Sequence, residues 1–174
     1  LMEREDIDSI DVMIIDDNVE GSAPSNLKVN GISEVYSVPR MMIRAEKNGV
    51  ARGWSLYLLT GWNFEIEASK ERATKLLART KPKLLIGSPM CTHSSSLMNL
   101  NWGRMSPEVA AAKWNQAINH LAFCVELYRI QMAEGRVFLH EHPLSATSWT
   151  VLCVLDMLKD PRVHLVQAHQ CELG

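Results

Sequence analysis

Short apolar runs alternate with segments of helical periodicity along most of the chain. Five runs have the length and composition of strands, and several of them are apolar almost throughout, as in strands buried on both faces of a parallel sheet. Glycine, proline or polar residues follow most of these runs and mark their ends. The pattern therefore predicts strands at residues 34–37, 54–59, 84–86, 137–140 and 163–167.

Four segments between these runs have the spacing and end signals of helices. The clearest begins at Ser106-Pro107, because a serine hydroxyl caps a first turn well and proline fits the first helical position. Its apolar residues recur at positions on one helical face, and Gly135 supplies a stop signal. The other predicted helices span residues 41–48, 69–80 and 149–159, and we expect Ser69 to be an N-cap.

The alternation of strands and helices predicts the fold class. We expect an α/β fold of the Rossmann-like, three-layer type, with a mostly parallel sheet and right-handed crossovers. At 174 residues the chain is long enough for one such domain and too short for two of ordinary size. We assign this domain to residues 33–174 and an acidic N-terminal arm and linker to residues 1–32.

Charge separates this arm from the rest of the chain. Residues 1–32 hold eight acidic and two basic residues, a net charge of −6, whereas the whole chain carries −2. Such a segment is typical of a solvated tail, and the alternative is a partner-binding arm. Its one apolar patch, residues 12–15, predicts either an extra strand or a docking peptide.

Composition narrows the class and the compartment. The net charge of about +4 on residues 33–174 is far from the strongly basic footprint of a dedicated DNA-binding domain. Four cysteines lack a CxxC pair, and neither a signal peptide nor an apolar run long enough for a membrane span is visible. We therefore expect an intracellular protein in a reducing compartment, either soluble or peripherally attached to something larger.

Two reactive side chains lie at the ends of predicted strands. Cys91 follows the run 84–86, and Glu141 directly follows the run 137–140. Open α/β sheets bind ligands outside the carboxyl ends of their strands, so both side chains are expected at one pocket. A strand-to-helix turn with free backbone N–H groups favours the thiolate of Cys91. For Glu141 the alternatives are capping a neighbouring helix and pairing with Arg40.

Other chemistry is compatible with the same residues. A cysteine hydrolase needs a nucleophile and a base, and the candidates are Cys91 with His93, His140 or His142. The same cysteine and histidines match no zinc module in their spacing, so loop histidines are the better interpretation.

The sequence motifs around Cys91 and Glu141 resemble those of a known family. Pro89-Met90-Cys91-Thr92 followed by Glu141-His142-Pro143 is similar to the proline-cysteine and glutamate-asparagine-valine motifs of DNA cytosine-5 methyltransferases. The resemblance is strongest to a compact phage-type and mobile-element-encoded branch, whose domains also occur inside polyproteins. It covers residues 35–174 and includes Val35-Tyr36-Ser37-Val38-Pro39-Arg40 and Leu59-Thr60-Gly61-Trp62-Asn63-Phe64.

The resemblance implies a fold, a reaction and a site. The fold is that of S-adenosylmethionine-dependent methyltransferases. In such enzymes a flipped cytosine is attacked at C6 by the cysteine, a glutamate holds N3, and C5 takes the methyl group. Cys91 is then the nucleophile and Glu141 the partner of N3. The implied cofactor-binding residues are Ser37, Pro39, Arg40, Thr60, Gly61, Asn63 and Pro89.

The chain also departs from the family pattern. Met90 replaces the usual proline before the cysteine, Ser94 and Ser95 replace phenylalanine and serine, and Tyr57 and Asn63 stand at two usually acidic positions. Since a ribose-binding carboxylate accepts two hydrogen bonds, neither Tyr57 nor Asn63 can replace it. Two functions follow: a divergent DNA cytosine-5 methyltransferase, or a catalytically inactive, co-opted fold acting as a structural or interaction subunit of a larger assembly.

The ends of the chain suggest processing. The sequence begins at Leu1 rather than at Met2, and it ends shortly after the last predicted strand. We expect a segment of a longer product. If it is active, its partner is DNA; otherwise its partners are proteins, with the acidic arm as an anchor.

Overall fold

Six strands form one mixed sheet. The computed structural model describes residues 9–15, 31–95 and 98–169. The strand order is β3-β2-β4-β5-β1-β6, in which β2, β3, β4 and β5 are parallel and β1 runs antiparallel to both β5 and β6. The strands are β1 (Ser9–Ile15), β2 (Ile32–Val35), β3 (Arg52–Leu56), β4 (Leu84–Gly87), β5 (Val137–Pro143) and β6 (Val163–His169).

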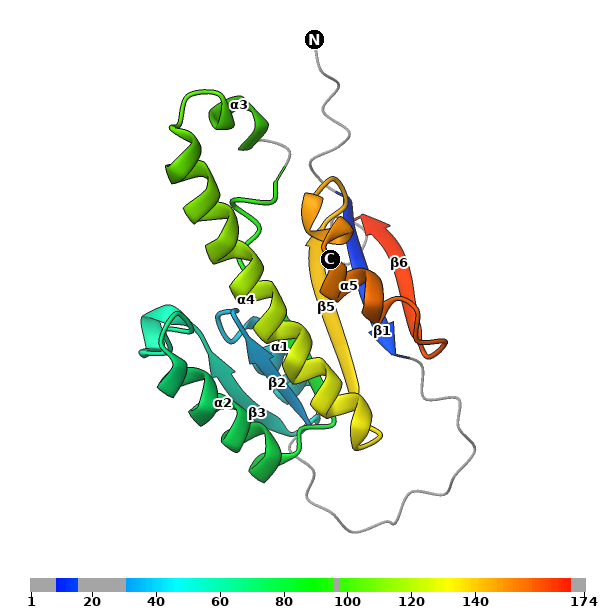
Figure 1. Cartoon of the computed structure of the whole chain (residues 1–174). Coiled ribbons are helices and arrows are strands. Elements are labelled where there is room, and N and C mark those ends of the chain that lie inside the picture. Colours follow the sequence, from blue (N-terminus) through cyan, green and yellow to red (C-terminus); the bar gives the residue numbers. More distant parts are fainter. Residues whose placement is uncertain (1–8, 16–30, 96–97, 170–174) are drawn as a thin grey trace.

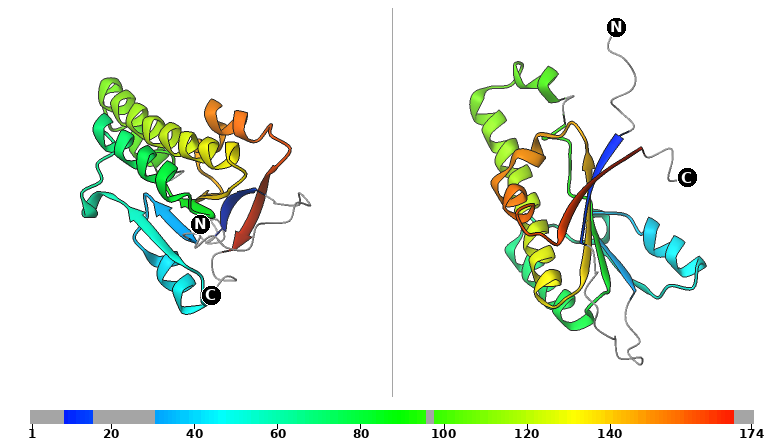
Figure 2. Two further views of the ribbon diagram at one scale, coloured as in Figure 1. Left: turned by 90° about the horizontal axis from the view of Figure 1, so that it is seen from below. Right: turned by 90° about the vertical axis from the view of Figure 1, so that its right-hand side faces the viewer.

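Helices lie on both faces of this sheet (Figures 1 and 2). One face carries α2, α4 and α5, and the other carries α1 beside β2 and β3. The helical elements are α1 (Arg40–Lys47), η2 (Leu58–Thr60), α2 (Glu67–Thr80), α3 (Asn99–Trp102), α4 (Pro107–Ala133), η4 (Thr147–Thr150) and α5 (Leu152–Met157). The predicted α/β class with a parallel sheet is confirmed. Four parallel strands with helices on both faces are compatible with a Rossmann-like fold.

Most predicted elements are present, and several have different ends. The long helix α4 begins after Ser106, whose hydroxyl accepts the N–H of Val109 at 3.4 Å, as expected for its N-cap. Ser69 is not an N-cap, because α2 already begins at Glu67 and buries Ser69 within its first turn. The strand predicted at 54–59 ends at Leu56, and residues 58–60 form a 3₁₀ turn instead.

The N-terminal apolar patch is a strand. Residues 12–15 lie within β1, which is inserted between β5 and β6. Of the two interpretations of this patch, the structure shows the extra strand. The sheet thus includes part of the segment that we assigned to an acidic arm, and the rest of that segment lies outside the described residues.

The core lies between the sheet and the helices α2, α4 and α5. Helix α4 supplies more core side chains than any other described element, because its apolar positions recur at helical spacing against β4 and β5. Members of this core are Val35, Leu56, Phe64, Leu77, Leu85, Leu121, Phe123, Cys124, Leu127, Tyr128, Phe138, Val154 and Met157. Cys124 is therefore a buried core residue, as its position on the apolar helical face predicted.

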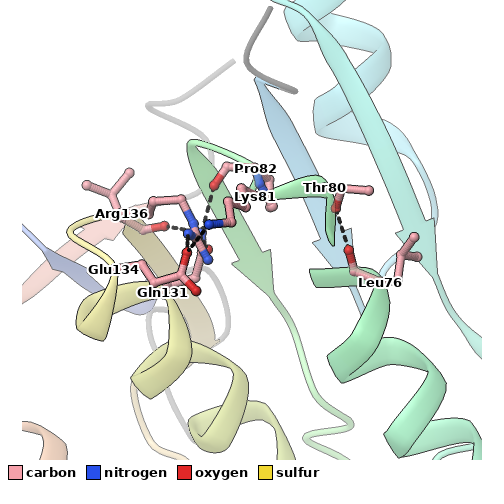
Figure 3. A network of polar contacts seen from close by, with 8 residues as sticks. Leu76, Thr80, Lys81, Pro82, Gln131, Glu134 and Arg136 are labelled. Atoms are coloured by element: carbon pink, nitrogen blue, oxygen red, sulfur yellow. Dashed lines mark hydrogen bonds and ion pairs between the residues drawn. The ribbon is translucent and has the colours of Figure 1, made fainter. Parts of the chain in front are cut away.

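A polar network joins the amino ends of β4 and β5, at the edge opposite Cys91 (Figure 3). The buried amide of Gln131 donates to the carbonyl oxygens of Pro82 and Val137, at 3.1 and 3.0 Å. Arg136 donates to the Gln131 side chain, and Glu134 pairs with Arg136 and Lys81. These bonds pair the side chains of Gln131, Glu134 and Arg136 where α4 turns into β5, while Nη2 of Arg136 has no partner in the described part of the chain. We therefore assign a structural role to this edge of the sheet.

Candidate functional site

Cys91 and Glu141 lie at the same edge of the sheet. The loop after β4 carries Cys91, and β5, the neighbouring parallel strand, carries Glu141. The backbone carbonyl of Cys91 accepts the N–H groups of Ser94 and Ser95, at 3.0 and 2.8 Å, which folds the loop into a tight turn. Its thiol is free and half-buried.

A buried histidine fastens this loop to β5. The ring of His142 lies between the carbonyl oxygen of Pro89, 2.9 Å from Nε2, and the hydroxyl of Ser148 at Nδ1. Because a carbonyl can only accept, Nε2 carries the proton and Nδ1 accepts from Ser148. Burial lowers the pKa of His142, which keeps the ring neutral. His142 thus fixes the backbone two residues before Cys91. The sequence did not predict this role.

The electrostatic environment of Cys91 differs from the expected one. Burial and the nearby carboxylate of Glu141 raise the pKa of the thiol, and the backbone hydrogen bonding of the turn lowers it only partly. We expected the turn to favour a thiolate; instead, desolvation and a like charge disfavour it. The same coupling shows that the two side chains lie within electrostatic range of each other, as the strand order predicted.

Glu141 is inside a strand rather than beyond it. Side chains of β5 alternate between the α4 face and the opposite face, and Phe138, His140 and His142 take the buried positions. Glu141 lies between the two histidines and is half-buried. Among the described residues, no ion pair joins Glu141 to Arg40 and no helix N-terminus is capped by it. Both structural roles weighed from the sequence are therefore absent from the described part.

His140 belongs to a buried hydrogen-bonded chain. The thiol of Cys124 donates to the hydroxyl of Tyr128, at 3.0 Å, and this hydroxyl lies 2.9 Å from Nδ1 of His140. Burial lowers the pKa of His140 to about 3, so the ring is neutral. Both rings are enclosed and accept a hydrogen bond at Nδ1, although Nε2 of His140 is buried without a partner in the described part of the chain. Their burial leaves His93 as the base for a cysteine hydrolase.

His93 itself is half-buried, and burial together with Lys113 lowers its pKa. Its Nδ1 atom is buried without a hydrogen-bond partner in the described part of the chain. No group of three or more potential metal ligands occurs among the described residues.

The predicted cofactor turns are adjacent but internally bonded. Ser37 and Thr60 follow the paired strands β2 and β3, and the hydroxyl of Ser55 donates to the carbonyl of Ser37. The hydroxyl of Ser37 donates to Glu34 at 2.9 Å, and that of Thr60 to the Tyr57 carbonyl at 2.9 Å.

The other predicted residues of this set are also part of the local structure. The side chain of Asn63 accepts the N–H of Glu65 at 3.0 Å, and Gly61 has φ +84° where the 3₁₀ turn ends. Pro39 precedes α1 as its N-cap residue, and Arg40 begins this helix and is exposed. Pro89 is buried, and its carbonyl oxygen accepts a hydrogen bond from His142. The residues predicted to bind a cofactor therefore offer few free polar groups to a ligand.

An open pocket of about 460 Å³ lies beside these turns. None of the seven residues predicted to bind a cofactor lines it. The lining residues are Phe64, Glu65, Lys70, Ala112, Lys113, Asn115, Gln116, Asn119 and His120. Sequence reasoning missed this group, although Lys113, Gln116 and His120 recur at helical spacing and form a polar stripe on α4.

Comparison of the chain with protein-family models, with curated proteins and with solved structures finds no match. The fold and the site are those of an α/β protein whose four parallel strands are compatible with a Rossmann-like fold, with a thiol and a carboxylate supplied by adjacent strands at one edge of the sheet. Among the described residues, no helix combines the length and apolarity needed to cross a bilayer.

Proposed function

We propose that this chain is a divergent DNA cytosine-5 methyltransferase domain. One observation carries the proposal: Cys91 and Glu141 come from neighbouring parallel strands, at the edge where such sheets bind ligands, and they interact electrostatically. The resemblance of the motifs around both residues assigns them the nucleophile and the N3 partner. The partner of such a domain is DNA with a flipped cytosine.

The raised pKa of Cys91 suggests how these two residues share a proton. In the free protein the raised pKa of Cys91 keeps the thiol protonated, and the Glu141 side chain lies within electrostatic range of it. When cytosine lies between them, the thiol proton passes to Glu141 and on to N3, and the sulfur bonds to C6. No net charge is created, because N3 gains the proton that sulfur loses. After C5 has received the methyl group, solvent water takes the C5 proton, the C6–S bond breaks, and the N3 proton returns through Glu141 to the departing thiolate, which restores the thiol of Cys91.

S-adenosylmethionine, when bound, supplies the methyl group that C5 receives. The remaining task of the chain is to hold the base and to exclude water from Cys91. Pro89 and His142 perform the positioning, because their hydrogen bond sets the backbone before the nucleophile.

A second candidate function is an inactive subunit of a larger assembly. It is favoured by the hydrogen bonds of Ser37, Thr60 and Asn63, which engage these side chains within their own turns. A fold that has been retained to present a protein-binding surface does not need free hydrogen-bonding groups at the predicted cofactor-binding positions. Its partners are proteins rather than DNA.

A covalent trap separates the two candidates. DNA containing 5-fluorocytosine blocks loss of the C5 substituent, so an active chain incubated with S-adenosylmethionine accumulates a DNA adduct at Cys91, detectable by gel shift and mass spectrometry. Cys91→Ser should abolish the adduct. Cys153→Ser is the matched control, because Cys153 is also half-buried but lies in α5. Wild-type protein that forms no adduct would leave the inactive subunit as the function.

A further inference from the structure

The pocket beside the cofactor turns has a position typical of ligand sites. The chain leaves β2 for β3 on one side and then returns through α2 to β4 on the other, so the sheet reverses its order next to β2. Open α/β sheets bind ligands at such reversal points. Tyr36, which directly follows β2, connects this strand to the pocket. The centroid of its ring lies 4.8 Å from that of Phe64, which lines the pocket.

One residue that lines the pocket, His120, is a hydrogen-bond donor whose ring is oriented by a hydrogen bond with Tyr36. The hydroxyl of Tyr36 lies 3.0 Å from Nδ1 of His120, a side chain that is 6% exposed. Since burial raises the pKa of Tyr36, its hydroxyl is protonated and donates, which leaves the proton of the neutral His120 on Nε2. Tyr36 has φ +62°, a strained conformation for a tyrosine that is common at ligand sites.

The rim of the pocket carries charges of both signs. Glu65 lies 3.9 Å from Nε2 of His120 and accepts a hydrogen bond from Gln116. Lys70 is already paired with Glu67 at 3.2 Å. Lys113 forms no ion pair with any described residue, and it acts electrostatically on His93, two residues beyond Cys91. An acid and an unpaired cation in one pocket match a zwitterion, and the volume of about 460 Å³ lies within the roughly 300–1,000 Å³ of small-molecule sites.

We propose that this pocket holds the amino-acid end of S-adenosylmethionine, with Glu65 facing its ammonium group and Lys113 its carboxylate. The inference rests on the proposed function, which supplies the ligand. It moves the cofactor from the turns at Ser37 and Thr60, whose polar groups are engaged, to the stripe of polar residues on α4. Lys113 then connects the cofactor pocket to the loop of Cys91.

Calorimetric titration tests the assignment through binding alone. Lys113→Gln and Glu65→Gln should each weaken S-adenosylmethionine and S-adenosylhomocysteine at least tenfold, because both ligands carry the amino-acid end. Adenosine, which lacks it, should bind wild type and variants equally. Lys75→Gln and Glu71→Gln are matched controls, since these residues form an exposed pair on α2 and do not line the pocket. Thermal unfolding of every variant checks that it folds.

The possible results have separate meanings. If Lys113→Gln and Glu65→Gln bind S-adenosylmethionine as wild type does, the pocket assignment is overturned while the proposed reaction stands. A wild-type chain that binds S-adenosylmethionine but forms no adduct in the 5-fluorocytosine trap overturns the reaction and keeps the pocket. Wild type that binds none of the three ligands overturns both.

Discussion

The absence of a side chain at Gly87 lets α4 approach the end of β4. A Cβ atom at this position would lie 2.0 Å from the hydroxyl oxygen of Tyr128 and 2.6 Å from the sulfur of Cys124. Both groups are fully buried and belong to the hydrogen-bonded chain that reaches His140. Gly87 therefore sets the distance between the sheet and its main helix at the last residue of β4, directly before the loop of Cys91.

We predict that Gly87→Ala destabilises the protein. The new methyl group overlaps Tyr128, and the shift that relieves it costs about 1–3 kcal/mol, the usual range for overpacking. Urea unfolding followed by circular dichroism measures this loss. Gly103→Ala is the control, because a Cβ atom there meets nothing within 4 Å and φ is −69°. Equal stability of the two variants would contradict the close approach.

The sequence placed Cys91 and Glu141 together, and it could not predict their electrostatics. Their adjacency follows from strand order, which the alternating pattern indicates. The raised pKa of Cys91 depends on how deeply the loop is buried and on the direction of the Glu141 side chain. In the same way, the roles of His140 and His142 follow from their alternation on β5 and from partners more than five residues away.

A buried carboxylate caps α1 from the strand before it. Glu34 is fully buried in β2, and its two oxygens accept the backbone N–H of Met42 and the hydroxyl of Ser37, both at 2.9 Å. Met42 lies in the first turn of α1, whose N-cap residue, Pro39, has no capping side chain. A negative charge at a helix N-terminus is favourable, so Glu34 replaces the missing cap.

We predict that Glu34→Gln weakens α1 and the turn before it. The amide can still accept one hydrogen bond, and it loses the charge that strengthens both, at a cost of about 1–2 kcal/mol. Faster amide exchange over residues 40–47 and a lower urea midpoint should report the loss. Glu46→Gln is the control, since Glu46 forms only an exposed pair with Arg52 and should change stability little. Unchanged exchange in Glu34→Gln would refute the capping role.

The start of α4 was predictable from a local signal, whereas the start of α2 and the end of β3 were not. Ser106-Pro107 marked the start of α4 because the capping bond is made within four residues. The end of β3 at Leu56 instead depends on pairing with β2, which itself ends at Val35. Leu58 and Leu59 then continue an apolar run and are exposed in the 3₁₀ turn, so the apolar pattern overestimated the strand.

The buried histidines make the stability of the whole molecule depend on pH. His140 and His142 are neutral because burial lowers the pKa of both, that of His140 to about 3 from an ordinary 6.5. Well above pH 6.5 both rings are unprotonated in the folded and the unfolded state, so the effect is absent. As the pH falls below 6.5, the unfolded chain takes up protons that the folded chain does not, so the free energy of unfolding falls.

We therefore predict lower stability at pH 5 than at pH 7, with a slope of up to about 1.4 kcal/mol per pH unit for each such histidine. Urea unfolding at both pH values measures it. His140→Phe should lower stability at pH 7, because Tyr128 loses its partner, and should make the slope shallower. His164→Gln, which alters an exposed histidine of β6, should leave the slope unchanged. A flat profile in wild type would argue against the buried neutral rings.

The sequence by itself determined the α/β class, most helices and strands, and the placement of Cys91 and Glu141 at one edge of the sheet. These features follow from local periodicity, caps and the order of strands, which depend on nearby residues. Tertiary structure alone decided the insertion of β1 between β5 and β6, the partners of Glu34 and His142, and the pocket along α4. These depend on contacts between segments far apart in the chain, where burial and charge act through space rather than along the sequence.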